Sequence, residues 1–180
     1  PWYFFLQQDV NFDANGRVYI ANTWTHQIQK FDPSGAFLGS WGSLGSNTGQ
    51  FSSPTDLAIS PAGFVYVADN GNSRIQKFDL NGTFISTWGT SGTADGQMQV
   101  PNGIVIDGSG NVLVADTNNH RIQKFDPDGA FLGAWGTQGI ADGQFNYPDG
   151  LAIDSSGNLY VADRNNHRIQ KFAPDFTHLL

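Results

Sequence analysis

The chain has 180 residues and a formal net charge of −7, and its 16 acidic residues are all Asp. Residues that favour helices are scarce or absent, whereas Gly numbers 22 and the aromatic residues comprise 14 Phe, 5 Trp and 5 Tyr, which excludes a mostly helical protein and a disordered chain. There is no Cys and no apolar run near the roughly 18 residues of a membrane helix, which excludes a disulfide framework, a thiolate metal site and a membrane-spanning segment.

The first residues form an apolar run at 2–6 that follows Pro1 rather than an initiator Met. The run is too short for a signal peptide and lacks the basic flank of one. We interpret the start as that of a processed or excised piece, and the run as a candidate edge strand that helps closure. The compartment is not fixed by these features, and a secreted or cell-surface location is slightly favoured.

Four short strands, here called a, b, c and d, are expected in the first repeat, at 9–13, 18–21, 27–31 and 36–41. Tight turns separate them. Asp-Ala-Asn-Gly at 13–16 joins strands a and b, and Asp-Pro-Ser-Gly at 32–35 joins strands c and d.

The same pattern recurs along the chain at a fixed period of 47 residues. The step Ile-Gln-Lys-Phe begins at Ile28, Ile75, Ile122 and Ile169. The later strands are expected at 56–60, 64–68, 74–78 and 83–88, at 103–107, 112–115, 121–125 and 130–135, and at 150–154, 159–162 and 168–172. The repeats span approximately residues 1–47, 48–94, 95–141 and 142–180. A period of this length indicates a repeat architecture in which each unit is one supersecondary element.

Four antiparallel strands in about 40–50 residues are typical of a β-propeller blade. Strand c supports this reading, because Ile75 and Phe78 point to opposite faces, as in a blade that lies between two neighbours. We therefore predict an all-β protein, a single β-propeller domain built of four 47-residue, four-stranded antiparallel blades. A β-solenoid with four strands per coil is the alternative.

The third repeat resembles the NHL repeat. The resemblance rests on Pro-Asn-Gly-Ile-Val-Ile-Asp at 101–107, Gly-Asn-Val-Leu-Val-Ala-Asp at 110–116 and Asn-Asn-His-Arg-Ile-Gln-Lys-Phe at 118–125, with Arg121 in place of the Leu of the family name. It implies a β-propeller, most often six-bladed. Members of the family include protein-interaction modules, RNA-binding modules, extracellular sensor domains and an amidating lyase, so the resemblance supports the fold more than the function.

Four complete repeats would be longer than the chain, and the last Trp-Gly loop is missing. Three arrangements remain open: closure as four blades, an arc of a larger and typically six-bladed ring, and a homo-oligomer that completes the ring. An open arc would leave two apolar blade faces in water.

The b–c loop and the long d–a loop lie at one end of every expected blade, and we predict that this loop-rich end is the binding surface. The candidate partner contacts are positions that vary between repeats: Trp24, Asn70, Thr117 and Arg164 after strand b, and Asp56, Asn102 and Asp149 at the entry to strand a. Trp24 is an anchor for a partner or a cap on the first blade. The strand-a group should make the central channel polar and acidic, which raises Ca²⁺ as a candidate ligand there.

Positions that recur in every repeat are expected to be structural. The residues that close strand b should accept backbone N–H bonds across the b–c turn; they are Asn22, Asp69, Asp116 and Asp163. The aligned His26, His120 and His167 make a zinc site a candidate. Against it, Ser73 holds this position in the second repeat, and successive blades are expected to be too far apart to share one ion.

The basic residues of strand c are also read as structural. Ion pairs or stacking on aromatic rings are expected for Arg74, Arg121 and Arg168. Solvated positions at the blade rims are expected for Lys30, Lys77, Lys124 and Lys171.

No catalytic, cofactor or metal residue is predicted. The resemblance to the amidating lyase implies zinc-binding histidines at three positions, but this chain has Thr55, Asn102 and Asp149 there. Propeller lactonases of similar architecture use a Glu as a metal ligand, and this chain has no Glu. We predict a non-catalytic scaffold that binds a protein, peptide or glycan on its loop-rich end. The alternatives are an RNA-binding NHL module, which the charge of −7 disfavours, and a piece of a propeller lyase or hydrolase whose catalytic blades lie elsewhere.

Overall fold

The computed structural model describes residues 7–180, so the edge strand predicted at 2–6 lies outside the described residues. The first sheet contains β1 (Gln7–Phe12), β2 (Val18–Asn22), β3 (Gln27–Phe31) and β4 (Phe37–Trp41). The second contains β5 (Pro54–Ile59), β6 (Phe64–Asp69), β7 (Arg74–Asp79) and β8 (Phe84–Trp88). The third contains β9 (Pro101–Ile106), β10 (Val112–Asp116), β11 (Arg121–Phe125) and β12 (Phe131–Trp135).

The fourth sheet contains three strands, β13 (Pro148–Ile153), β14 (Leu159–Asp163) and β15 (Arg168–Phe172). An antiparallel bridge between Phe172 and His178 occupies the place of a fourth strand. The b–c loops of the last three sheets contain the short 3-10 helices η1 (Asn70–Asn72), η2 (Thr117–Asn119) and η3 (Arg164–Asn166). No helix within residues 7–180 is long and apolar enough to cross a membrane.

Aspartate-rich turns join the strands at the hairpin end. In the turn between β7 and β8, Oδ1 of Asp79 accepts hydrogen bonds from the backbone N–H groups of Asn81 and Thr83, each at 2.8 Å. Gly82 in this turn has a φ of +85°, a conformation that glycine adopts at little cost. Equivalent carboxylates close five other hairpins, whereas Ser60 stands in the turn between β5 and β6; the five are Asp13, Asp32, Asp107, Asp126 and Asp154. Much of the acidic charge therefore serves local turn geometry.

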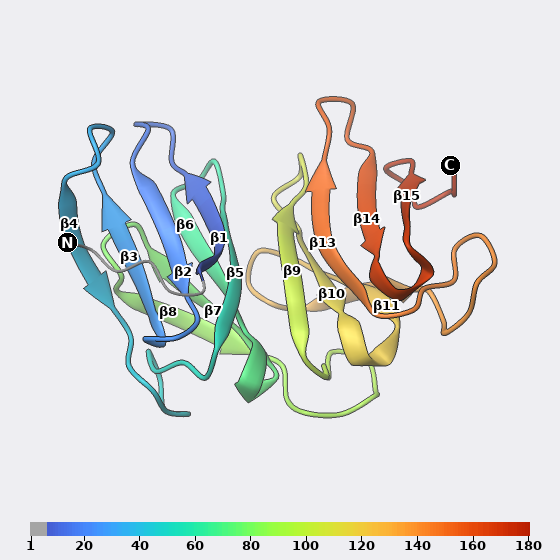
Figure 1. Cartoon of the computed structure of the whole chain (residues 1–180), viewed down its shortest axis with the longest axis horizontal. Helices are drawn as coiled ribbons and strands as arrows, with labels where there is room; N and C mark the ends of the chain where they lie inside the picture. The colour runs from blue at the N-terminus through green and yellow to red at the C-terminus, as the bar shows by residue number, and fades with distance from the viewer. Residues whose placement is uncertain (1–6) are drawn as a thin grey trace.

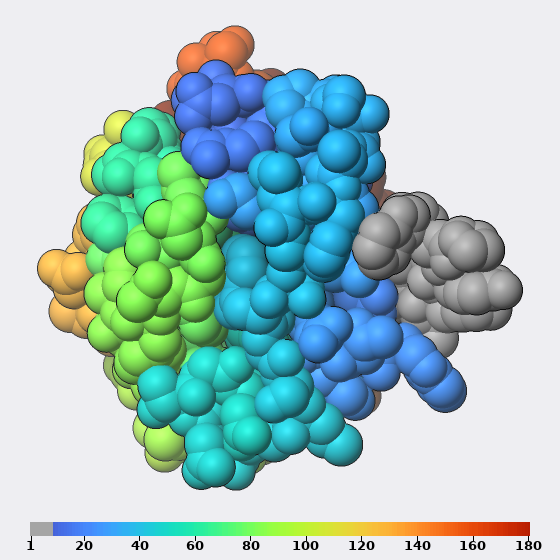
Figure 2. All heavy atoms as spheres, turned by 90° about the vertical axis from the view of Figure 1, so that its left-hand side faces the viewer, coloured from blue at the N-terminus to red at the C-terminus, as the bar shows by residue number. Residues whose placement is uncertain are grey.

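The four sheets follow one another around a central axis as the blades of a β-propeller, which confirms the predicted fold. The innermost strands β1, β5, β9 and β13 stand side by side in chain order, with the hairpins at one end and the b–c and d–a loops at the other (Figure 1). Hydrophobic clusters fill the junctions between successive blades. At the first junction, Tyr19 and Ile28 pack with Leu57 and Val67, and Figure 2 shows these two blades in direct contact, in blue and green.

Each d–a loop is held by the blade that it enters. The loop before β5 places the buried Phe51 in the junction. From β7, the fully buried Gln76 accepts a hydrogen bond from the N–H of Gly49 at 3.0 Å and donates one to the carbonyl oxygen of Gln50 at 2.6 Å. The same two bonds are made by Gln123 and Gln170. The invariant Gln of the Ile-Gln-Lys-Phe step therefore holds the d–a loop in place at the loop-rich end.

The strand-c lysines reach across the blade junctions. Lys77 is buried, lies 4.4 Å from the centre of the Phe64 ring, and donates a hydrogen bond to the carbonyl oxygen of Pro127 in the next blade at 2.9 Å. Lys30 donates to Leu80 in the same way at 2.7 Å. The expectation of a solvated lysine at the rim was therefore wrong for Lys77, because its stem packs on aromatic rings while its ammonium group finds a carbonyl acceptor.

Candidate functional site

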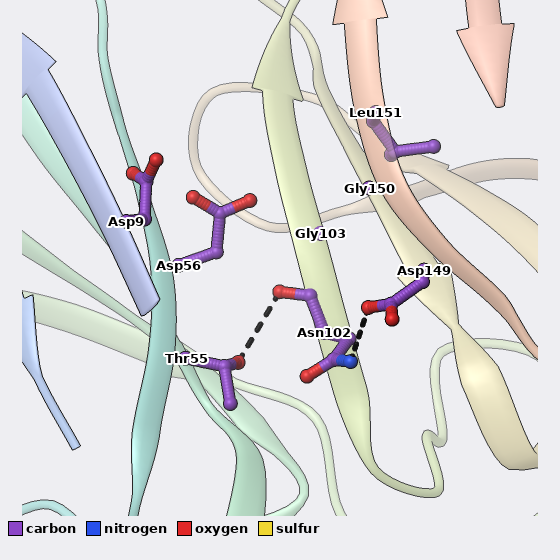
Figure 3. Close-up of a pocket in the computed structure, with 8 residues that line it drawn as sticks. All are labelled: Asp9, Thr55, Asp56, Asn102, Gly103, Asp149, Gly150 and Leu151. Carbon is purple, nitrogen blue, oxygen red and sulfur yellow. Dashed lines mark hydrogen bonds between the residues drawn. The ribbon is translucent and has the colours of Figure 1, made fainter. Parts of the chain in front are cut away.

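The starts of the four innermost strands line a cavity of about 210 Å³ on the channel side of the blades. The lining residues are Asp9, Thr55, Asp56, Asn102, Gly103, Asp149, Gly150 and Leu151. Figure 3 shows Asp9, Thr55 and Asp56 on one side and Asn102 and Asp149 on the other. The structure thus places Asp56, Asn102 and Asp149 together at the channel, where the repeat alignment had put them.

A chain of hydrogen bonds joins four of the candidate residues across three blades. Nδ2 of Asn70 donates to Oδ1 of Asn102 at 3.1 Å, and Nδ2 of Asn102 donates to Oδ1 of Asp149. Nη1 of Arg164 then lies 3.4 Å from Oδ2 of Asp149. We call Asn70, Asn102, Asp149 and Arg164 the mouth network. Because η1 and η3 contribute its two ends, it lies at the loop-rich end of the channel.

Thr55 connects the mouth network to the second blade. Its hydroxyl group lies within hydrogen-bond distance of two backbone acceptors, the carbonyl oxygen of Asn102 at 3.3 Å and that of Pro101 at 3.4 Å (Figure 3). The polar groups of the channel are therefore largely fixed by one another, which prepares them for binding with little loss of side-chain freedom.

Two carboxyl groups interact on the other side of the cavity. Burial, followed by a hydrogen bond with Asp9 and the charge of Asp9, raises the pKa of Asp56 well above its usual value. Asp56 also accepts the N–H of Ile104 at 2.8 Å, and Asp9 accepts that of Leu57 at 3.3 Å. The pair therefore ties the innermost strands together and holds a proton at a pH at which an isolated carboxyl group is ionised.

The position after strand b also links neighbouring blades. Nδ2 of Asn70 donates to the carbonyl oxygen of Pro101 at 3.1 Å, and the hydroxyl group of Thr117 donates to that of Pro148 at 2.7 Å. Thr117 is buried. Its side chain therefore stabilises the junction between the third and fourth blades, while a role as a partner contact stays a prediction.

Trp24 lies apart from the mouth network, on the b–c loop of the first blade. Its side chain is 67% exposed. It borders a cavity of about 340 Å³ together with Thr23, His26 and Ser53. This exposure is compatible with the predicted anchor, which no contact in the described chain tests.

The carboxylates that close strand b have the structural role predicted for them, with a different partner. Oδ1 of the fully buried Asp69 accepts the N–H of Ser52, from the incoming d–a loop, at 2.7 Å. Its Oδ2 accepts bonds from Arg74 at 2.7 Å and Gln76 at 3.0 Å. Among the described residues, Asn22 alone accepts a backbone N–H across its own b–c turn, that of Thr25 at 3.1 Å, whereas Asp69 accepts the side-chain amide of Asn72 there at 2.9 and 3.0 Å.

Two aligned histidines use a ring nitrogen within the fold. Nδ1 of His26 accepts the N–H of Ser53 at 2.9 Å, and Nδ1 of His120 accepts that of Tyr147 at 3.1 Å. In the part of the chain that the structure describes, no group of three His or Asp side chains is arranged to hold a metal ion. Channel Ca²⁺ stays a prediction that this structure does not test.

Asp9 lines the cavity but was not among the candidate partner contacts predicted from the sequence. The signal was present, because the 47-residue period aligns Asp9 with Asp56, whereas Gly103 and Gly150 hold this position in the last two repeats. A Cβ atom added at Gly103 would collide with the carbonyl oxygen of Asp149. The two glycines thus confine the carboxyl pair to the first two blades.

The repeats, the blades and the channel define an NHL-type β-propeller. The family model for the NHL repeat matches residues 145–172. The model for the SMP-30/gluconolactonase/LRE-like region matches residues 8–139, which is most of the chain. The chain belongs to the SMP-30/gluconolactonase/LRE-like family.

Solved structures agree on the fold. A streptogramin B lyase structure is similar with a TM-score of 0.75 and 19% identity over 96% of this chain and 53% of that one. A catalytically inactive virginiamycin B lyase from Staphylococcus aureus with quinupristin is similar with a TM-score of 0.74 and 13% identity, over 96% of this chain and 54% of that one. The structure of U3-55K is similar with a TM-score of 0.78 and 13% identity, over 99% of this chain and 52% of that one.

The chain spans about half the length of these solved structures. No curated protein sequence matches the chain. At these identities the likeness concerns the fold alone.

Proposed function

We propose that the chain is a non-catalytic propeller module that binds a partner at its loop-rich end, over the starts of β5, β9 and β13. The observation that carries the proposal is the mouth network, which joins side chains from three blades beside a cavity that Asn102 and Asp149 line. Convergent polar groups on a rigid scaffold are typical of a binding site.

The charge of the cavity favours a basic group on the partner. Asp149 and the Asp9–Asp56 pair line it. The pair holds a proton, so its negative charge is smaller than that of two ionised carboxylates, and Arg164 is the cation that pairs with Asp149. A cavity of about 210 Å³ takes one side chain rather than a folded element. We therefore propose an arginine- or lysine-bearing peptide segment of a protein as the partner, because its cation forms charge-assisted hydrogen bonds with carboxylates. Hydroxyl groups of a glycan are the weaker match.

Calorimetric titration with a tetra-arginine peptide at low salt tests this proposal. We expect binding that D149N weakens at least tenfold, because the substitution removes the central carboxylate charge. We expect R164A to strengthen binding, because Arg164 competes with the peptide for Asp149. The matched control is D126N, since Asp126 is an acidic residue of a distant hairpin whose turn bonds use one oxygen that Asn retains.

Three results would count against the proposal. Equal weakening by D126N and D149N would reduce it to non-specific attraction by the net charge. No heat with the wild-type chain would exclude a basic peptide. Binding of a single-stranded RNA that R164A weakens would favour the RNA-binding alternative.

A second candidate is lactone hydrolysis, because the family model that covers most of the chain is named for gluconolactonase. Hydrolysis of gluconolactone, followed by acid release with added Ca²⁺ or Zn²⁺, measures it directly. Turnover above the buffer rate that D149N abolishes would replace the binding proposal with a catalytic one.

A further inference from the structure

Each blade has a leading face, which packs on the next blade, and this face is exposed in the fourth blade. At the three other positions Ile28, Ile75 and Ile122 are fully buried, whereas their equivalent Ile169 is 57% exposed. Ile169 pairs with Ala162 as the other three pair with their strand-b alanines, but among the described residues it has no partner like the strand-d tryptophan that pairs with each of them. The side chain of Ile169 therefore lacks both this tryptophan and a following blade to cover it.

Each blade also has a trailing face, which packs on the preceding blade, and this face is exposed in the first blade. Val10 and Phe12 of β1 are 50% and 58% exposed. Their counterparts in later blades are less exposed, and Leu57 is fully buried in the first junction. Large exposed apolar side chains grouped on one sheet face are typical of an interaction surface.

Polar groups make the same junctions specific. At the first junction the hydroxyl group of Tyr19 and Nζ of Lys30 both donate to the carbonyl oxygen of Leu80, at 3.2 and 2.7 Å. At the second junction Tyr66 and Lys77 both reach the carbonyl oxygen of Pro127, at 3.1 and 2.9 Å. The third junction departs from this rule, because Leu113 replaces the tyrosine and Lys124 pairs with Asp107 at 2.8 Å.

The fourth blade carries the two donors, and the first blade carries the acceptor. Tyr160 donates to Asp154 of its own blade at 3.1 Å, and Lys171 lies 3.9 Å from the same carboxylate. The residue of the first blade that aligns with Leu80 and Pro127 is the exposed Pro33. Within residues 7–180, the carbonyl oxygen of Pro33 accepts no hydrogen bond.

We infer that a second copy of this chain docks head to tail, with the leading face of the fourth blade on the trailing face of the first blade. Ile169 then packs on Val10 and Phe12, and Tyr160 and Lys171 donate to the carbonyl oxygen of Pro33 in the other copy. The fit is the one that the chain already uses between its own blades. The contact is heterologous, so it closes into a ring or continues as a longer assembly, according to the rotation between copies.

The mass in solution, measured by light scattering after size-exclusion chromatography, tests this inference on the chain as it stands. We expect a mass of at least twice 19.5 kDa for the wild-type chain, and the monomer mass for I169D and for F12D. The matched control is I140D, because Ile140 is 81% exposed on a d–a loop away from both faces and should leave the assembly intact. Circular dichroism of each variant confirms that the blades remain folded.

Mixing the two monomeric variants separates head-to-tail docking from other associations. I169D retains a good trailing face and F12D retains a good leading face, so the mixture should form a dimer that neither variant forms alone. A monomeric, folded wild-type chain at about 100 μM would overturn the inference. A wild-type assembly that survives I169D and F12D, or a mixture that stays monomeric, would overturn it as well. None of these results depends on the basic-peptide proposal.

Discussion

Nη1 of Arg164 lies 3.4 Å from Oδ2 of Asp149, and this contact sets the charge at the rim of the channel. Arg164 also lies 6.0 Å from the centre of the Tyr147 ring. The other repeats place neutral residues at the position of Arg164, so the fourth blade alone adds a cation there. Because an exposed ion pair contributes only about 0–1 kcal/mol to stability, the pair of Arg164 with Asp149 adds little to the stability of the fold.

Two hairpin glycines form a matched pair that measures how much stability is lost when a side chain is added at a closely packed position. Gly35 and Gly82 occupy the same turn position with the same φ of +85°, but a Cβ atom at Gly82 would lie 2.6 Å from the Trp41 ring, whereas one at Gly35 meets nothing within 4 Å. We expect G35A to cost about 1 kcal/mol from backbone strain. We expect G82A to cost roughly 2–4 kcal/mol, since overpacking adds to that strain. Urea denaturation measures both, and equal losses would contradict the close packing.

The glutamine that holds each d–a loop allows a second comparison. Gln76 is fully buried and bonds to Gly49 and Gln50, whereas the side chain of Gln138 is exposed on a d–a loop. We expect Q76L to lower the free energy of unfolding by about 2–4 kcal/mol, because buried polar groups lose their partners. Q138L should cost less than about 1 kcal/mol. Similar losses of unfolding free energy in the two variants would contradict the role of Gln76 in holding the d–a loop.

Thr117 tests whether its side chain serves the blade junction. Its hydroxyl group donates to Pro148 at 2.7 Å in a buried position, whereas the side chain of Thr25 is exposed on the first b–c loop. T117V keeps the shape and removes the bond, so we expect a loss of about 1–2 kcal/mol in thermal or urea denaturation. T25V should change stability by less than about 0.5 kcal/mol. An unchanged T117V that impairs peptide binding would return Thr117 to the list of partner contacts.

The carboxyl pair predicts a dependence of stability on pH. The pKa of Asp56 is raised in the folded state by burial first and then by Asp9. Protonation of Asp56 therefore stabilises the fold most below the unfolded pKa of about 3.9, and this contribution is lost as the pH rises through the folded pKa.

D56N is the variant that isolates this effect, because every other titrating group is the same in both proteins. The free energy of unfolding of the wild-type chain relative to D56N should fall as the pH rises from 4 to 8. Urea denaturation at several pH values measures this difference. A constant or rising difference would contradict the raised pKa.

The blades were predictable because their turns are local. Asp79 and Gly82 fix a hairpin within a few residues, and the 47-residue period repeats that information. The convergence of Asp56, Asn102 and Asp149 also followed from register, since Asn102 and Asp149 hold the same position in successive repeats and Asp56 lies one residue further along its strand.

The contacts between blades were not predictable to the same degree. Lys77 reads as a surface residue in its own strand, and its acceptor, the carbonyl group of Pro127, lies 50 residues further along the chain. Asp69 bonds to a loop residue 17 positions earlier. Such partners depend on how one blade rotates against the next, which no local pattern encodes.

The most direct test of the binding site is a map of backbone amide chemical shifts during titration with the tetra-arginine peptide. We predict that the largest shifts cluster at Thr55, Asn102 and Asp149 and that D149N removes them. Shifts confined to the hairpin end, at Gly35, Gly82 and Gly129, would contradict a site at the loop-rich end of the channel.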